Sequence, residues 1–378
     1  MSPNISTGFW TRNELDERDV RRCIGAVKDQ YPIHVVEELE DQGYCSYTLL
    51  ISPLSDASET AQERGKTGST IKKRAHDLPC SYIVQIRPEQ HLLDIEIART
   101  AIETYGSLAP AVRTLDLLLP PRLQAFELSY LEGVPYTRRQ SRTPQLDPST
   151  WQKQAALVQS FAAVIARSWD VHARTAYSSR SYRADSPIQD NPDCLLSLCR
   201  GRVGSQIFRK LHYLSQNLPD ASLRQKTKHL LSRLQALEDL PAILNHGDLI
   251  PSNILIDEET WQIKGLVDWA EAEVLPFGTC LYGLEHLLGY FDASDVAKPR
   301  FVYYGGAPRL REMFWTRLEE EVPESRGLKE KIMLARDVGV LLWFGYAWDE
   351  GAIDRVVNNE DDREELECLR KFLDIRKD

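Results

Sequence analysis

Short apolar runs joined by polar segments predict β structure in the first third of the chain. Residues 35–39 and 47–51 flank a short polar connection that contains Gly43, which predicts a hairpin. Residues 82–88 and 123–129 are further short apolar runs bounded by polar or proline positions. We therefore expect four strands before residue 130.

Helical spacing of apolar residues dominates the rest of the chain. Apolar residues recur every three to four positions in residues 91–105 and again in 151–174, which predicts two helices. The same spacing predicts further helices at 226–237, 281–290, 309–321, 328–348 and 361–373. Such apolar stripes are most simply explained as core.

A composition change after the fourth strand indicates a domain boundary. Gly133 and Pro135 follow that strand closely, so we divide the chain into 1–130 and 131–378. The polar stretch near 55–78 contains a glycine-lysine run. That run lacks the preceding strand and the earlier glycine of a phosphate-binding loop, so we interpret it as a surface loop.

Composition narrows the possible partners. The 378 residues include 42% apolar and 27% charged residues, as is ordinary for a globular protein, and the net charge of −10 argues against nucleic-acid or membrane partners. The seven cysteines form no C-x-x-C pair, which predicts reduced thiols. No secretory signal or membrane-length apolar run is present. We expect a cytoplasmic protein.

Three polar residues near the middle of the chain have spacings suited to phosphoryl transfer. Asp248 and Asn253 are five apart, and Asp268 follows a predicted hairpin formed by residues 254–256 and 263–267. We expect Asn253 at the start of one strand and Asp268 at the end of the other, so that all three converge. A carboxylate on a rigid loop suits Asp248 as general base, and oxygen ligands from Asn253 and Asp268 suit Mg²⁺. Taken singly, these motifs occur often in ordinary turns.

The segments 246–253 and 267–272 resemble the catalytic loop and the D-W metal motif of the aminoglycoside phosphotransferase and choline kinase-like family. The flanking segments resemble the branch common in filamentous fungi. This resemblance implies an α+β, two-lobed, protein-kinase-like fold. It comprises a small antiparallel-sheet N-terminal lobe with one main helix and a larger, mainly helical C-terminal lobe. It also implies ATP and Mg²⁺ as cofactors, and support of the catalytic loop by His246.

The resemblance implies a nucleotide-binding N-terminal lobe, but its strand lysine is absent here. In residues 82–88, alternation places Gln85 and Arg87 on one face, so the basic group facing phosphate is Arg87. A solvated arginine on an edge strand is the alternative. Glu96 is the candidate ion-pair partner, with Asp94 second. The remaining nucleotide contacts that the resemblance implies are Gly43, Ser46, Tyr130 and Leu131.

The length of the segment after Asp268 indicates the size of the acceptor. Only seven residues separate Asp268 from Pro276, too few for the activation segment of a protein kinase, which favours a small acceptor. Candidate contacts for an amine-bearing acceptor are Glu271, Asp349 and Glu350, although acids at helix ends are commonly just solvated.

Two functions are compatible with these residues. The leading hypothesis is an ATP- and Mg²⁺-dependent O-phosphotransferase acting on a small hydroxylated metabolite. The alternative is a kinase-fold protein that has lost phosphoryl transfer and serves as a binding protein or performs other biosynthetic chemistry. The missing strand lysine favours the alternative, whereas the complete Asp–Asn–Asp set favours the enzyme.

Overall fold

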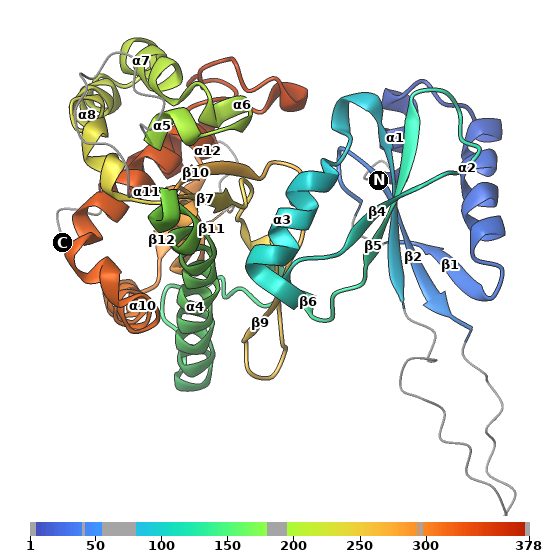
Figure 1. Cartoon of the computed structure of the whole chain (residues 1–378), viewed down its shortest axis with the longest axis horizontal. Helices are drawn as coiled ribbons and strands as arrows, with labels where there is room; N and C mark the ends of the chain where they lie inside the picture. Colours follow the sequence, from blue (N-terminus) through green and yellow to red (C-terminus); the bar gives the residue numbers. More distant parts are fainter. Residues whose placement is uncertain are drawn as a thin grey trace, which may run out of the picture. The chain divides into compact units, whose positions relative to one another are not determined.

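The chain divides into two compact units, each with its own core (Figure 1). In a computed structural model, the described residues are 5–39, 42–54, 81–179, 195–292, 294 and 298–374, with side chains left out for 5–7 and 170–179. The first unit is Met1–Arg99 with Pro110–Tyr130, and the second is Thr100–Ala109 with Leu131–Asp378. The predicted polar loop near 55–78 lies outside the described residues.

An antiparallel five-stranded sheet forms the centre of the first unit, in the order β1-β2-β3-β5-β4. Its strands are β1 (His34–Glu38), β2 (Tyr47–Pro53), β3 (Tyr82–Pro88), β4 (Val112–Leu115) and β5 (Leu123–Ser129). The four predicted strands are confirmed, and β4 was not predicted. Because β3 pairs with β2 on one side and β5 on the other, the edge-strand interpretation of Arg87 was wrong.

Two helices that the sequence analysis did not predict, α1 (Ile5–Arg12) and α2 (Glu17–Gln30), pack on this sheet. The N-terminal lobe therefore has more than one helix. Asp16 and Asp19 form a reciprocal capping box that starts α2. The apolar faces of both helices share one core with β2 and β3, formed chiefly by Phe9, Trp10, Cys23, Val27, Tyr47, Leu49, Ile51, Val84 and Ile86.

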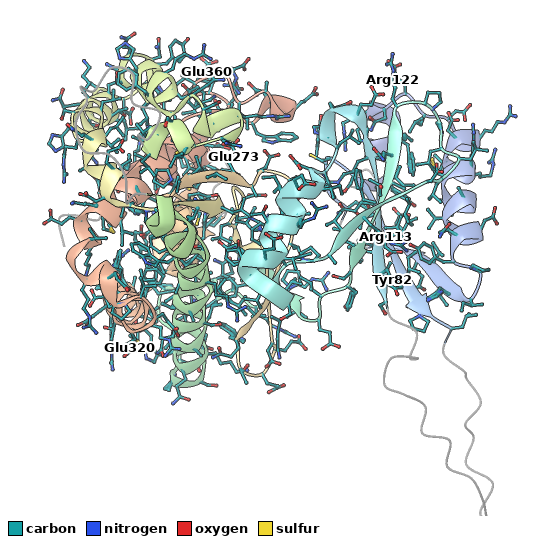
Figure 2. The ribbon with its side chains drawn as sticks, in the orientation of Figure 1. Tyr82, Arg113, Arg122, Glu273, Glu320 and Glu360 are labelled. Atoms are coloured by element: carbon teal, nitrogen blue, oxygen red, sulfur yellow. The ribbon has the colours of Figure 1, made fainter. Side chains whose placement is uncertain are left out.

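Salt bridges and caps fix the remaining parts of the first unit. Figure 2 labels Arg113, which lies on β4. It donates to the Glu127 carboxylate from Nε at 2.6 Å and from Nη2 at 2.7 Å. The predicted helix at 91–105 begins only at Ile95, as α3 (Ile95–Tyr105), because the Asp94 carboxylate accepts the first backbone N–H groups.

Residues 100–109 belong to the second unit, although the sequence analysis placed all of 1–130 in the first. The reason lies in Tyr105, which is buried. Its hydroxyl donates to the Leu244 carbonyl at 3.1 Å, and its ring lies 4.9 Å from that of Trp269. An aromatic residue at a helix end gave no sign of this partner in the sequence.

Helices make up most of the second unit (Figure 1). They are α4 (Pro148–Ser179), α5 (Leu195–Leu198), α6 (Gly201–Gly204), α7 (Ile207–Asn217), α8 (Ala221–Leu231), α9 (Tyr282–Leu287), α10 (Ala307–Glu321), α11 (Lys329–Phe344) and α12 (Arg363–Phe372). The α+β fold class is thus confirmed, with an antiparallel sheet in one unit and mainly helices in the other. None of the helices in the described ranges is long and apolar enough to cross a membrane.

Two predicted helices have different bounds. The helix expected at 226–237 is α8, which ends at Leu231 and is followed by a 3₁₀ segment, Leu234–Asp239. The helix expected at 281–290 ends at Leu287, and the chain continues as β11 (Gly289–Asp292), paired with β12 (Arg300–Tyr303). A Cβ on Gly289 would lie 2.4 Å from the Val302 carbonyl oxygen, so a glycine is required for this pairing.

Two small sheets support the loop that carries Asp248. One is β6 (Val134–Pro135), β8 (Ile254–Ile256) and β9 (Ile263–Leu266), and the other is β7 (Ala242–Asn245) with β10 (Glu273–Pro276). The predicted β8–β9 hairpin is confirmed, whereas β7 and β10 were missed.

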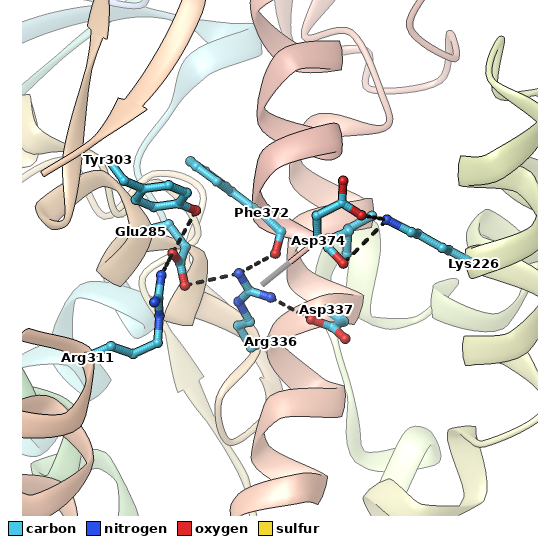
Figure 3. Close-up of polar contacts among 9 residues, drawn as sticks. Lys226, Glu285, Tyr303, Arg311, Arg336, Asp337, Phe372 and Asp374 are labelled. Carbon is cyan, nitrogen blue, oxygen red and sulfur yellow. Dashed lines mark hydrogen bonds and ion pairs between the residues drawn. The ribbon is translucent and has the colours of Figure 1, made fainter. Parts of the chain in front are cut away.

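A buried ionic network connects α9, α10 and α11 (Figure 3). Glu285 accepts from Arg311 at 2.8 Å, from Arg336 at 3.0 Å and from the Tyr303 hydroxyl at 3.0 Å. Arg336 also pairs with Asp337 at 2.7 Å. Since Glu285 and Arg336 are nearly inaccessible to water, removing either would leave an unpaired charge in the core.

Candidate active site

The loop from His246 to Asn253 runs directly from β7 to β8 and is anchored at its start. The buried side chain of Asn245 donates to the Leu275 carbonyl on β10 at 3.1 Å and accepts from the Cys280 amide at 3.0 Å. The loop ends in a 3₁₀ turn, Pro251–Asn253. Both ends of the loop are therefore fixed by paired strands.

Gly247 occupies the position of the arginine in the protein-kinase loop. Its φ is +79°, and a Cβ there would lie 1.8 Å from the Glu271 carbonyl oxygen. A left-handed backbone that approaches another chain segment so closely admits only glycine. This packing brings the loop against the segment that follows Asp268.

Asp248 is held by both its backbone and its carboxylate. Asn253 Nδ2 donates to Asp248 Oδ2 at 2.8 Å and to the Asp248 carbonyl at 2.9 Å. No described residue donates a hydrogen bond to Asp248 Oδ1 or to Asn253 Oδ1. One carboxylate oxygen and one amide oxygen thus stay available for a ligand.

His246 joins the loop to the segment that carries Asp268. Its Nε2 lies 2.9 Å from the Val267 carbonyl, and its Nδ1 lies 3.3 Å from the Asp248 amide nitrogen. A carbonyl only accepts and an amide only donates, so the proton is on Nε2 and the ring is neutral. Burial lowers the pKa of His246 to about 4, which keeps the ring neutral at physiological pH. The predicted supporting role of His246 agrees with this geometry.

The pKa of Asp248 is suited to proton transfer near neutrality. Burial chiefly, together with the nearby charges of Asp268 and Glu271, raises this pKa to about 7, although the hydrogen bond from Asn253 opposes the rise. A carboxylate that takes up a proton near pH 7 meets the requirement for a general base.

Aromatic rings support the exposed Asp268. Trp269 donates from Nε1 to the Leu266 carbonyl at 2.9 Å, and its ring lies 4.5 Å from His246. The Tyr105 ring lies on Trp269 as well. Asp268 itself has φ +63°, a left-handed conformation that is uncommon outside glycine. The D-W pair was predicted from the sequence, whereas the contact of Tyr105 with Trp269 was not.

In the first unit, the candidate phosphate-binding arginine is tied to its neighbours. Arg87 is 2% exposed, donates from Nε to Gln85 Oε1 at 2.9 Å and donates from Nη1 to the His91 carbonyl at 3.1 Å. Gln85 therefore orients Arg87. Glu96 pairs with Arg99 at 2.7 Å on the surface of α3, and the predicted Arg87–Glu96 ion pair stays a prediction. Asp94, the second choice, caps α3.

The hairpin loop between β1 and β2 is closed by a side chain that the sequence analysis missed. Gln42 Nε2 donates to the Leu39 and Thr48 carbonyls at 2.8 and 2.7 Å, and Gln42 Oε1 accepts from the Thr48 amide at 2.8 Å. Ser46 is buried beside Thr48, with 3.2 Å between their hydroxyl oxygens. Gly43 has space around it: an added Cβ would meet only Ser46 Oγ, at 3.9 Å.

The chain leaves the first unit after Tyr130, which is 43% exposed. Leu131 packs against β9, where a Cβ on Gly265 would lie 2.7 Å from Leu131 Cδ1. Gly133 has φ +128° and lies close to the backbone of Ile256. Tyr130 is the last residue of the first unit and Leu131 belongs to the second, and their role in binding adenine stays a prediction.

The acidic candidates for an amine-bearing acceptor differ in their surroundings. Asp349 binds Arg355 through both carboxylate oxygens, at 2.6 and 2.9 Å, and Arg355 also pairs with Asp362. An amine would have to displace that guanidinium from Asp349. Glu350, next to it, has φ +57° and is exposed. Glu271 is partly buried and close enough to influence the Asp248 carboxylate.

Comparison with known proteins identifies the family. The model of the phosphotransferase enzyme family matches residues 82–279, just over half of the 378 residues. The chain belongs to this family. The match includes β3, the loop of residues 246–253 and Asp268, while the placement in a fungal branch stays a prediction.

Solved phosphotransferases of similar fold include macrolide 2′-phosphotransferase MphH from Brachybacterium faecium, with 15% identity and a TM-score of 0.45 over 86% of this chain and 92% of that one. Another is aminoglycoside phosphotransferase APH(3″)-Id from Streptomyces rimosus, with 16% identity and a TM-score of 0.42 over 85% and 98%. A search of curated proteins gave no match. The family assignment rests on the sequence match alone.

The oxygen atoms of this phosphotransferase fit a magnesium ion that is shared with a nucleotide. Within the described ranges, no three His, Cys, Asp or Glu side chains form a metal cage. Mg²⁺ in kinase sites needs only one or two protein oxygens, because phosphates and water complete its shell. Asn253 Oδ1 accepts no hydrogen bond from the described residues, and the Asp268 carboxylate is exposed. Both are suitable ligands.

Proposed function

We propose that this phosphotransferase is an ATP- and Mg²⁺-dependent small-molecule kinase that phosphorylates a hydroxyl group of a compact metabolite. The observation that carries the proposal is the state of Asp248. Its main chain and Oδ2 are held by His246 and Asn253, while Oδ1 stays open. A fixed carboxylate with one available oxygen is what an acceptor hydroxyl needs.

In this mechanism, the acceptor hydroxyl donates its hydrogen bond to Asp248 Oδ1. The hydroxyl oxygen attacks the γ-phosphorus of ATP, the bond from that phosphorus to the bridging oxygen breaks, and ADP leaves. Asp248 accepts the hydroxyl proton and later releases it to solvent. Asn253 and Asp268 would hold Mg²⁺, which when bound neutralises charge on the phosphates.

The first unit would bind the nucleotide in this proposal. Arg87, oriented by Gln85, would offer positive charge to phosphate, with Glu96 as its partner. The β1–β2 hairpin would cover the phosphates through Gly43 and Ser46. The backbone at Tyr130 and Leu131 would contact adenine.

The path of the chain after Asp268 supports a compact acceptor. Residues 273–276 form β10, which pairs along its length with β7, and the chain then turns directly into α9. A protein kinase has its activation segment here, as a docking platform for a peptide. An amine on the acceptor of this chain would be placed by Glu271.

The decisive experiment is the change Asp248→Asn. It keeps the shape of the side chain but removes the proton acceptor, so transfer of labelled phosphate from ATP to an acceptor found in a metabolite screen should fall about 10²- to 10⁴-fold. Binding of ATP with Mg²⁺, followed by thermal shift, should stay within a few-fold of wild type. Asp361→Asn, a surface change, is the matched control. Wild-type turnover in Asp248→Asn contradicts the proposal.

A kinase-fold binding protein is the second candidate, favoured by the absence of a lysine in β3. ATP and Mg²⁺ added together distinguish the two. A rise in melting temperature that requires both ATP and Mg²⁺ favours the enzyme. A melting temperature that responds to neither favours the binding protein.

A further inference from the structure

One tyrosine hydroxyl contacts the main chain on both sides of Asp248. Tyr282, on α9, donates from Oη to the Gly247 carbonyl at 2.8 Å, and the same oxygen accepts from the Leu249 amide at 3.3 Å. Tyr282 is 3% exposed, so water does not replace these bonds readily. The hydroxyl therefore bridges the two peptide groups that flank the proposed base.

The position of this hydroxyl is itself fixed by packing. The Tyr282 ring is stacked on Trp343 at 5.2 Å with a 10° angle between the planes, and Phe344 meets it edge-on at 5.9 Å. The next residue of α9 is Gly283, where a Cβ would lie 2.7 Å from the Leu249 carbonyl oxygen. The start of α9 thus fits directly against the loop, with α11 behind it.

We propose that Tyr282 is a positioning residue for phosphoryl transfer, which sets the direction of the Asp248 carboxylate by bridging Gly247 and Leu249. The inference rests on the proposed function. His246 and Asn253 hold the polar groups of Asp248 itself, whereas Tyr282 holds its neighbours. Without the hydroxyl, each of the two flanking peptide groups loses one hydrogen bond and keeps another, to His246 Nδ1 or from Asn253 Nδ2, so both can tilt further and Asp248 Oδ1 moves with them. A displacement of about 1 Å at a reacting group costs about 10²-fold in rate.

The test is Tyr282→Phe, which removes only the hydroxyl and keeps the stack on Trp343. The kcat for phosphate transfer should fall about 10- to 100-fold, while the KM for ATP should change less than about threefold. Tyr304→Phe is the matched control. It also removes one buried hydroxyl, which donates to the Ser141 carbonyl at 3.0 Å, far from the loop in sequence, and it should keep the wild-type kcat.

Hydrogen exchange supplies a readout that needs no activity. The Leu249 amide should exchange faster in Tyr282→Phe than in wild type or Tyr304→Phe, because it loses its acceptor. Should Tyr282→Phe fail to fold, Trp343→Phe loosens the stack instead and should show the same effects at smaller size.

The outcomes separate the two ideas. A wild-type protein without transfer activity refutes the proposed function, and exchange at Leu249 then decides alone whether Tyr282 holds the loop. An unchanged Leu249 exchange rate, or a kcat loss no greater than that of Tyr304→Phe, overturns the positioning role. A changed KM for ATP with an unchanged kcat in Tyr282→Phe also overturns the positioning role.

Discussion

The two units prepare their candidate phosphate-site residues in different ways. In the second unit, Asp248 and Asn253 bind each other and each keeps one oxygen open. In the first unit, Arg87 is buried and donates to Gln85 and to the His91 carbonyl. The loop is therefore preorganised for a ligand, whereas the arginine would have to exchange protein partners for phosphate.

This difference indicates where catalysis and where binding are sensitive to change. Groups that are fixed before the substrate arrives need no reorganisation during the reaction, and their loss is costly. A group that must first leave other partners contributes less to binding, because those hydrogen bonds are lost. We thus expect changes in the loop to affect turnover strongly, and changes at Arg87 to affect nucleotide affinity moderately.

The largest effect beyond Asp248 itself is expected at Asp268. Asp268→Asn removes the charge from a proposed magnesium ligand, so kcat/KM should fall about 10²- to 10³-fold. In the activity assay, the Mg²⁺ concentration that gives half-maximal activity should be higher than for wild type. An unchanged curve would mean that Asp268 does not bind the metal.

The next comparison uses one glycine from each unit. Gly247→Ala should destabilise the fold by about 3 kcal/mol or more, since its Cβ would overlap the Glu271 carbonyl at 1.8 Å and its φ is +79°. Gly43→Ala should change stability by less than about 0.5 kcal/mol, since nothing lies within 3.9 Å. Urea unfolding of both variants measures this. Equal losses would show that the hairpin needs its glycine too.

A pH effect on stability is expected from His286 on α9. Burial among phenylalanine rings lowers the pKa of His286 to about 4 from 6.5, despite the nearby Glu285. Between pH 6.5 and 4, this histidine is therefore protonated in the unfolded chain but not in the folded chain. Its contribution to the free energy of unfolding is full above pH 6.5 and is lost as the pH falls toward 4. The loss is about 3 kcal/mol for this one group.

The measurement compares urea unfolding of wild type and His286→Leu at pH 7 and pH 5. The free energy of unfolding of wild type, minus that of His286→Leu, should be smaller at pH 5 than at pH 7. As the pH falls, the lowered pKa of His246 reduces the stability of both proteins, and the raised pKa of Asp248 increases it in both. Only the difference between the two proteins therefore reports the effect of His286. If the difference in free energy of unfolding is the same at both pH values, the buried His286 does not cause the loss of stability.

The smallest effect is expected at Arg87. Arg87→Lys keeps a positive charge but loses the fork that binds Gln85 and His91, so the KM for ATP should rise about three- to tenfold with kcat nearly unchanged. Arg113→Lys, on β4, is the control for a general effect on the sheet. If both changes leave the KM for ATP unaltered, Arg87 only supports the first unit.

The elements that the sequence predicted best have a strong local pattern. The four predicted strands of the first unit are short runs rich in apolar residues, and the β8–β9 hairpin has apolar runs around a polar turn. The Asp–Asn spacing located the loop because both residues lie in one short connection between two strands. Local pattern and observed structure agree there.

The features that were missed depend on partners far away in the sequence. The strands β7 and β10 are four residues each and pair across the whole catalytic loop. Tyr282 contacts a loop more than thirty residues away, and Tyr105 donates to Leu244. A short strand or a single hydroxyl carries no periodic signal, so tertiary contact alone reveals its role. Local signals were overlooked as well: the Asp16–Asp19 cap of α2, and the helical spacing of apolar residues in α2 and α7.

The left-handed backbone of Asp268 has an evolutionary consequence. At φ +63° glycine is the least costly residue, and aspartate is tolerated there at some expense in stability. A lineage selected only for a durable fold would drift toward glycine at this site. In the proposed mechanism this cost in stability is offset by the metal ligand that the acid supplies, so Asp268→Gly would be more stable and inactive in phosphate transfer.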